Sequence, residues 1–157
     1  MGMKIVWIAA LALAGWLFGY LFIRQFLFNL IVALPLVKKM NKETELINKN
    51  ANRYTGVSIA VCVLVTAIVL FLVIRFMKPY LMYSFLGGLL VCFIMLFAVV
   101  KPENEAMFNS FCASYYRFVP DDELRQAIYD KNIKKIKLRL HDLEQPLDWI
   151  PDVKKSK

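Results

Sequence analysis

The chain has 157 residues, a net charge of +8 and a mean hydropathy of +0.52, and 59% of its residues are apolar. Soluble domains are about 45–50% apolar, so this composition excludes an ordinary soluble domain and indicates a small helical membrane protein. The charge surplus lies in the first 100 residues, which carry nine basic and two acidic side chains. Residues 101–157 carry 11 basic and 10 acidic side chains and are nearly neutral. Charges that flank membrane helices give this pattern, and it argues against a nucleic-acid partner.

The first segment, residues 1–37, predicts a transmembrane helix with an apolar extension. Residues 5–23 form an unbroken apolar run, which we interpret as a retained span and not as a cleaved signal peptide. Gly15 and Gly19 stand four residues apart in this run, a spacing of small residues that lets helix backbones approach closely. We therefore expect Gly15 and Gly19 to pack against another helix.

Polar residues interrupt the apolar stretch at Arg24 and Gln25, and Asn29 follows. A single helix over residues 5–37 would be about 50 Å long, which exceeds the bilayer core of about 30 Å. In one interpretation Arg24 lies at the cytoplasmic interface, and the segment from Phe26 onwards is shallow or packs on a partner. In the other, one long tilted helix places Arg24 inside the membrane with a partner. In either case we expect Pro35 to kink or end the helix.

Residues 38–54 are expected to form a basic cytoplasmic loop. The stretch 38–53 holds five basic and two acidic residues, and the positive-inside rule places such a loop in the cytoplasm. The N-terminus is then outside and the C-terminus inside. Glu45 and Lys49 have the spacing of a helical ion pair, whereas the asparagines of this stretch disfavour a long helix.

Residues 55–100 predict a tight transmembrane hairpin of two helices. Two uncharged apolar runs flank a short turn that contains Arg75 and Lys78, and Pro79 suits the first position of the returning helix. Ser84 and Gly88 repeat the small-residue spacing, and we expect them to pack against a helix. No Asp, Glu or His lies in either run, which argues against a proton or cation path.

The first run of the hairpin carries a weakly polar stripe. Ser58, Cys62 and Thr66 follow one another at four-residue spacing, which places them on one face of a helix. Small hydroxyl and thiol side chains are common where membrane helices contact each other. The stripe therefore predicts a helix-packing surface.

Residues 101–157 predict a cytoplasmic helical tail, which begins near Pro102. An apolar face follows at helical spacing, and it is either a core face or a face that lies on the membrane surface. Its members are Phe108, Phe111, Cys112, Tyr115 and Val119. A second helix start is expected at Asp121, and a helix–turn–helix follows.

The last part of the tail offers two alternatives and a basic side. The spacing of Ile136 and Leu140 favours a helix, whereas strict alternation over residues 136–141 is a strand signal. The basic side either attracts anionic lipid headgroups or contacts a partner, or it is an ordinary solvated face, and Trp149 suggests docking. The candidate contact residues are Lys134, Lys135, Lys137, Arg139 and Trp149.

Catalytic and metal-binding patterns are absent from the sequence. His141 is the only histidine, and no phosphate-binding glycine loop or H-E-x-x-H pattern occurs. The three cysteines are scattered and do not form a disulfide framework. We therefore expect no enzyme activity, no metal and no cofactor.

These features predict an all-α integral membrane protein with three transmembrane helices, the second and third as a tight hairpin. Its function is expected to be that of a non-catalytic subunit that packs into a larger complex, with the bilayer and other membrane subunits as partners. The expected location is the bacterial cytoplasmic (inner) membrane. One alternative is a homo-oligomeric channel or small transporter with a path lined by Arg24, Gln25 and Asn29. Another is a membrane-anchored adaptor that acts through its tail.

Overall fold

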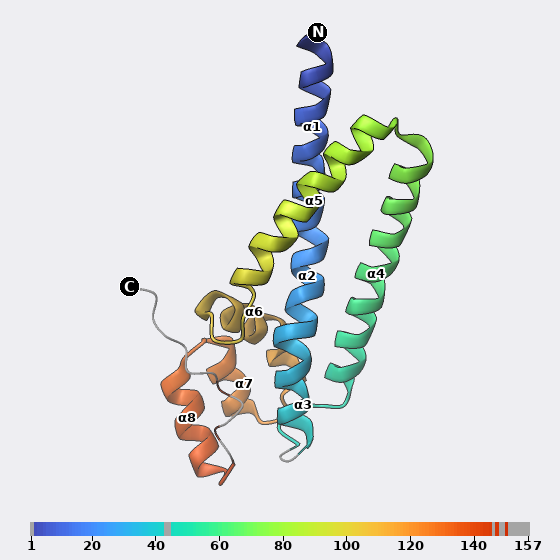
Figure 1. Ribbon diagram of the computed structural model, residues 1–157. Coiled ribbons are helices and arrows are strands. Elements are labelled where there is room, and N and C mark those ends of the chain that lie inside the picture. Colours follow the sequence, from blue (N-terminus) through green and yellow to red (C-terminus); the bar gives the residue numbers. More distant parts are fainter. Residues whose placement is uncertain (1, 43–44, 146, 148–149, 151–157) are drawn as a thin grey trace. The chain divides into compact units, whose positions relative to one another are not determined.

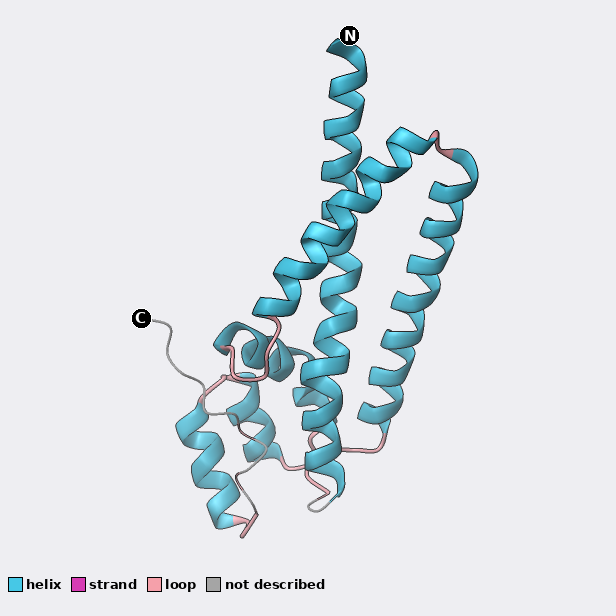
Figure 2. Cartoon of the chain, viewed as in Figure 1, coloured by secondary structure: helices cyan, strands magenta, loops and turns pink. Residues whose placement is uncertain are grey.

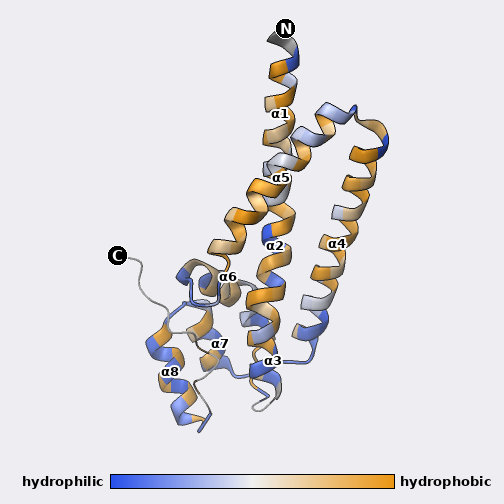
Figure 3. Ribbon diagram, in the orientation of Figure 1, coloured by the Kyte–Doolittle hydropathy of each residue, from blue (hydrophilic) through white to orange (hydrophobic). Residues whose placement is uncertain are grey.

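The computed structural model describes residues 2–42, 45–145, 147 and 150. All regular structure in these residues is helical, as expected (Figure 2). Three helices are long and apolar enough to cross a membrane: Lys4–Asn41, Asn50–Phe76 and Pro79–Val99. They stand out as the hydrophobic stretches of the chain in Figure 3. The expectation of three apolar helices of membrane-spanning length is confirmed.

The first of these helices runs without a break through the position where the sequence left two interpretations open. It consists of α1 (Gly2–Phe18), η1 (Gly19–Ile23), α2 (Arg24–Leu27), η2 (Phe28–Ala33) and α3 (Leu34–Lys42). Its 38 residues from Lys4 to Asn41 correspond to about 57 Å. It is therefore one long helix, and the position of Arg24 relative to the membrane stays a prediction.

Pro35 does not end this helix, because a π-helical segment lies directly before the helix α3 that contains it. Pro35 lacks an N–H group, and its ring crowds the carbonyl group four residues earlier. The segment η2, directly before α3, is a π-helix, in which the hydrogen bonds run over five residues. This change of hydrogen-bond register lets the chain pass Pro35 and continue to Lys42.

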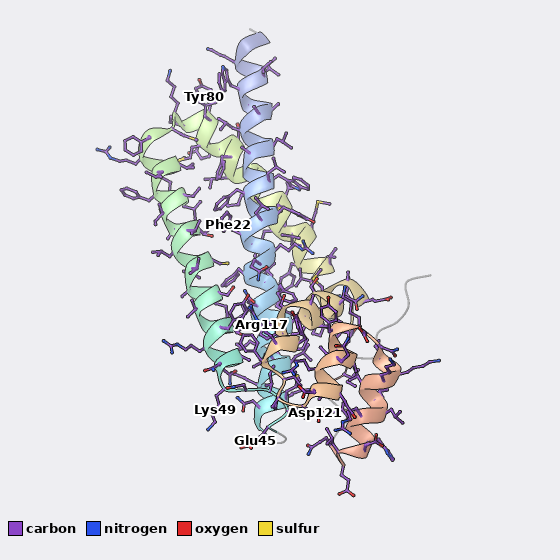
Figure 4. The ribbon with its side chains drawn as sticks, turned by 180° about the vertical axis from the view of Figure 1, so that it is seen from behind. Phe22, Glu45, Lys49, Tyr80, Arg117 and Asp121 are labelled. Carbon is purple, nitrogen blue, oxygen red and sulfur yellow. The ribbon has the colours of Figure 1, made fainter. Side chains whose placement is uncertain are left out.

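The loop before the hairpin is shorter than expected. The helix α4 (Asn50–Phe76) begins at Asn50, whose backbone N–H donates to the side-chain oxygen of Asn48 over 3.0 Å. Asparagine thus starts this helix instead of preventing it. Glu45 has a φ of 48° and lies outside any helix, so the helical pair expected of Glu45 and Lys49 is wrong (both labelled in Figure 4). The end of the hairpin is as expected, since α5 (Pro79–Val99) begins at Pro79.

The chain divides into two compact units (elements labelled in Figure 1). The first comprises Met1–Leu27 and Ser58–Val100, and the second comprises Phe28–Val57 and Lys101–Lys157. The segments expected from the sequence were 1–37, 38–54, 55–100 and 101–157, so the tail does not form a unit by itself. The tail and residues 28–57 together form the second compact unit.

The core of the second unit contains the aromatic face predicted for the tail. The tail folds into α6 (Glu105–Tyr115), η3 (Tyr116–Phe118), α7 (Asp122–Tyr129) and α8 (Ile133–Asp142). All five residues of the predicted face are at most 2% exposed, so it is a core face and not a face on the membrane surface. Helix α6 begins at Glu105 with Asn104 as its cap, three residues beyond Pro102.

The same core includes side chains from the end of the first long helix. Val32, Ala33 and Val37 are fully buried and Met40 is 1% exposed. Most of the segment from Phe28 to Val37, which the first interpretation left shallow or packed on a partner, is therefore buried within the chain itself, where α6 packs against η2.

The helix–turn–helix of the tail is confirmed. Asp121 caps α7 by accepting a hydrogen bond from the backbone N–H of Leu124 over 2.7 Å. In α8, Ile136 and Leu140 are fully buried, whereas Leu138 is 66% exposed. A strand would place these three side chains on one face, so the strand alternative is wrong.

Candidate functional site

The helices α1 and α5 approach each other closely where they cross within the first unit. A Cβ atom built on Gly88 would overlap the carbonyl oxygen of Ala12 and would lie 2.8 Å from its carbonyl carbon. A Cβ atom on Gly15 would in the same way overlap the carbonyl oxygen of Phe85. The neighbours are backbone atoms, which cannot turn aside as a flexible side chain does. Glycine is thus required on both helices at this crossing.

The other two small residues expected at helix contacts behave differently. A Cβ on Gly19 would lie 3.1 Å from the Cβ of Cys92 and 3.3 Å from a methyl group of Leu89, which are side-chain contacts. Ser84 donates its hydroxyl to the Tyr80 carbonyl oxygen over 2.8 Å, within its own helix. Gly19 lies in the contact between η1 and α5, whereas Ser84 bonds within α5 itself.

The three polar residues of the first long helix do not share one environment. The Arg24 guanidinium lies 5.3 Å from the ring centre of Tyr20 and donates to its hydroxyl over 3.4 Å. Gln25 is exposed on the first unit. Asn29 belongs to the second unit, where it is 1% exposed.

An apolar groove separates α4 from the first long helix within the first unit. It has a volume of about 370 Å³. Cys62 and Thr66, two members of the weakly polar stripe, line it, together with Ala67 of α4, Phe26 of α2 and Phe93 of α5. These two members of the stripe thus lie at a groove between α4 and the helices α2 and α5. The spacing of the stripe in the sequence indicated a packing surface but not where it faces.

The basic side of α8 is partly neutralised inside the second unit. Arg139 donates two hydrogen bonds to the carboxylate of Asp121, over 3.2 and 2.9 Å, and lies 2.9 Å from Glu123. These hydrogen bonds hold the pKa of the Asp121 carboxyl below its usual range. The other basic candidates, Lys134, Lys135 and Lys137, are exposed, and Trp149 lies outside the described residues.

A buried polar pair in the second unit was not foreseen from the sequence. The hydroxyl of Thr55 donates to the carbonyl oxygen of Ala51 over 2.9 Å and shares a hydrogen bond of 2.7 Å with the hydroxyl of Tyr115. Tyr115 is therefore the donor in this second bond. Burial of Tyr115 raises its pKa, and burial of the neighbouring Cys112 raises the pKa of that thiol to about 12.

No group of three or more His, Cys, Asp or Glu side chains that could hold a metal ion lies within residues 2–42 and 45–145. Comparisons with protein-family models, with curated proteins and with solved structures find no match to this chain. The candidate functional features are thus the glycine crossing, the groove beside α4 and the surface of the second unit.

Proposed function

We propose that the chain is a non-catalytic integral membrane subunit that packs into a larger membrane protein complex and helps to assemble it. The observation that carries this proposal is the open groove beside α4. The weakly polar side chains of Cys62 and Thr66 line this groove, which is open within the described part of the chain.

The occupant that fits this groove is a transmembrane helix of another protein. Helices associate in lipid through close packing and through small or weakly polar side chains, and the groove offers both. Ala67 on its wall leaves room for a neighbouring backbone. The helices α1 and α5 pack closely against each other through Gly15 and Gly88.

The proposed orientation has the N-terminus outside and the C-terminus inside, in the bacterial cytoplasmic membrane. Five basic residues between positions 38 and 53 support this orientation, against two in the turn of the hairpin. The compact second unit, which includes this loop and the tail, would then lie on the cytoplasmic side.

The two alternatives find less support. A channel path that includes Asn29 needs this side chain to reach water, yet Asn29 is 1% exposed. An adaptor that acts through an independent tail needs residues 101–157 to fold alone, yet their compact unit includes residues 28–57. Expressed alone, residues 101–157 are expected to remain largely unfolded, which far-UV circular dichroism measures.

The test places a photo-activated cross-linking side chain at Ala67, in the groove, and at Ile68 as the control. The two positions lie at nearly the same depth in α4, but Ile68 is 50% exposed and does not line the groove. The full chain is cross-linked in its own membrane, and the products are identified by mass spectrometry. Ala67 is expected to give one dominant protein partner, which Ile68 does not give.

A second measurement tests whether the groove is required. Ala67→Trp fills it, whereas Ile68→Trp adds the same side chain on the other side of α4. After extraction in mild detergent, Ala67→Trp should lose the co-purifying chains and Ile68→Trp should keep them. The subunit function would be refuted if Ala67 cross-links to lipid alone and the extracted protein has the native mass of a single chain. A ring of this chain alone would favour the channel alternative.

A further inference from the structure

A shallow hollow of about 630 Å³ lies on the second unit, where α4 begins. Asn50, Arg53, Tyr54 and Val57 contribute the α4 side, and η3 contributes the other side through Arg117 and Phe118. All these residues belong to the same compact unit. The hollow is separate from the groove beside α4, which lies in the first unit.

Two hydrogen bonds hold η3 beside the start of α4. The backbone N–H of Asn48 donates to the carbonyl oxygen of Phe118 over 2.8 Å. Seven residues further along the chain, the buried bond between Thr55 and Tyr115 ties α4 to the end of α6. The two walls are therefore fixed relative to each other before any ligand binds, which lowers the cost of binding.

The hollow carries two positive charges. Arg53 and Arg117 are both exposed, and neither forms an ion pair within the described part of the chain. The Arg117 guanidinium lies 4.9 Å from the ring centre of Tyr54 and 5.1 Å from that of Phe118 (Arg117 is labelled in Figure 4). Stacking on two rings orients the guanidinium while its N–H groups stay available to an anion.

The position of the hollow along α4 indicates which anion it meets. Val57 begins a run of 18 residues, up to Ile74, that contains no charged side chain. If α4 crosses the bilayer, Tyr54 and Arg53 lie within one turn of the hydrocarbon edge, at the level of the lipid phosphates. Val57 is 56% exposed and gives the hollow an apolar wall on its membrane side.

We propose that this hollow binds the headgroup of an anionic phospholipid. The phosphate accepts hydrogen bonds from the guanidinium groups of Arg53 and Arg117, and the first part of an acyl chain lies against Val57. This assignment requires α4 to span the membrane, but it does not require the subunit function proposed above.

The experiment uses the full chain in mild detergent, to which phosphatidylglycerol or phosphatidylcholine with the same acyl chains is added. Native mass spectrometry counts the lipid molecules that remain bound. The test variant is Arg53→Gln with Arg117→Gln, and the control is Lys101→Gln with Lys131→Gln, which removes the same charge from exposed positions of the second unit outside the hollow. Far-UV circular dichroism and thermal unfolding establish that both variants are folded.

The wild type should bind one phosphatidylglycerol in preference to phosphatidylcholine. Each basic residue near the membrane surface contributes about fivefold to the affinity, so the arginine variant should lose about 25- to 30-fold. The lysine control should bind as the wild type does. A further variant, Arg53→Lys with Arg117→Lys, keeps the charge and should keep the preference for phosphatidylglycerol.

Four results would overturn the assignment. The first is a wild type that shows no preference for the anionic lipid, and the second is a lysine control that loses as much affinity as the arginine variant. The third is an Arg53→Lys, Arg117→Lys variant that binds no better than the glutamine variant. The fourth is displacement of phosphatidylglycerol by a large excess of inorganic phosphate, which would assign the hollow to a soluble anion. Retention of phosphatidylglycerol by a single purified chain would support the lipid site even if no partner protein is found for the groove.

Discussion

Replacing Gly88 by alanine tests the crossing of α1 and α5 most directly. The added methyl group would overlap the carbonyl oxygen of Ala12 and would lie 2.8 Å from its carbonyl carbon and 3.1 Å from its Cα. No side-chain movement relieves this overlap, because all three atoms belong to the backbone of α1. The two helices must separate or shift to accommodate the methyl group.

The magnitude follows from two opposing effects. An extra methyl group in a well-packed contact costs about 1–3 kcal/mol, whereas alanine in place of glycine favours a helix by about 0.8–1.0 kcal/mol. Gly87→Ala is the matched control, since a Cβ on Gly87 has no heavy atom within 4 Å. Gly87→Ala has only the favourable effect, so the free energies of unfolding of the two variants should differ by about 1–3 kcal/mol.

The assay is unfolding of the full chain in mixed micelles with increasing sodium dodecyl sulfate, followed by circular dichroism. A local readout comes from Gly19→Cys, because a Cβ at this position would lie 3.1 Å from the Cβ of Cys92. A small shift allows the spacing of about 3.5–4.5 Å that a disulfide needs, so oxidation should link α1 to α5. Equal stability and equal cross-linking of the Gly87→Ala and Gly88→Ala variants would refute the close backbone contact.

Three further predictions concern the second unit. Thr55→Val leaves the buried hydroxyl of Tyr115 without its acceptor and should cost about 1–3 kcal/mol in chemical unfolding, less when combined with Tyr115→Phe. Cys112 is fully buried with a pKa raised to about 12, so maleimide should label it only after denaturation, and labelling of Cys112 itself in the native chain, located by peptide mass spectrometry, would contradict its burial. The pKa of Asp121 is lowered by Arg139, so its ionised form stabilises the unit at neutral pH, and this contribution is lost as the pH falls below about 4. Asp121→Asn keeps a helix-capping oxygen but removes the charge, so the free energy of unfolding should fall less between pH 6 and pH 3 than in the wild type.

Several elements follow from the sequence because their causes are local. A run of about 20 uncharged apolar residues forms a helix in any apolar surrounding, and Pro79 suits only the first turn of the helix that follows. The caps of α7 and α8 are likewise local, since Asp121 and Asn132 accept hydrogen bonds from N–H groups three residues ahead. The predicted hairpin and the predicted helix–turn–helix rest on such short-range effects.

The partner of each apolar surface was decided by the tertiary structure. Apolar burial has no direction, so the sequence of residues 28–37 cannot indicate whether lipid, another protein or the tail covers them. The structure packs η2, the first part of this segment, against α6, more than 70 positions further along the chain. The bond between Thr55 and Tyr115 likewise joins residues 60 positions apart.

Small-residue spacing marked Gly15 and Gly88 as candidates for close contacts, but it could not say which helices would meet. That choice depends on how two helix backbones cross, and the crossing is set by the shapes of both surfaces together. Chain-local signals therefore determined the helices of this protein and their caps. Contacts over long sequence separations determined the glycine crossing, the groove beside α4 and the unit that residues 28–57 form with the tail, because each needs complementary surfaces from distant segments.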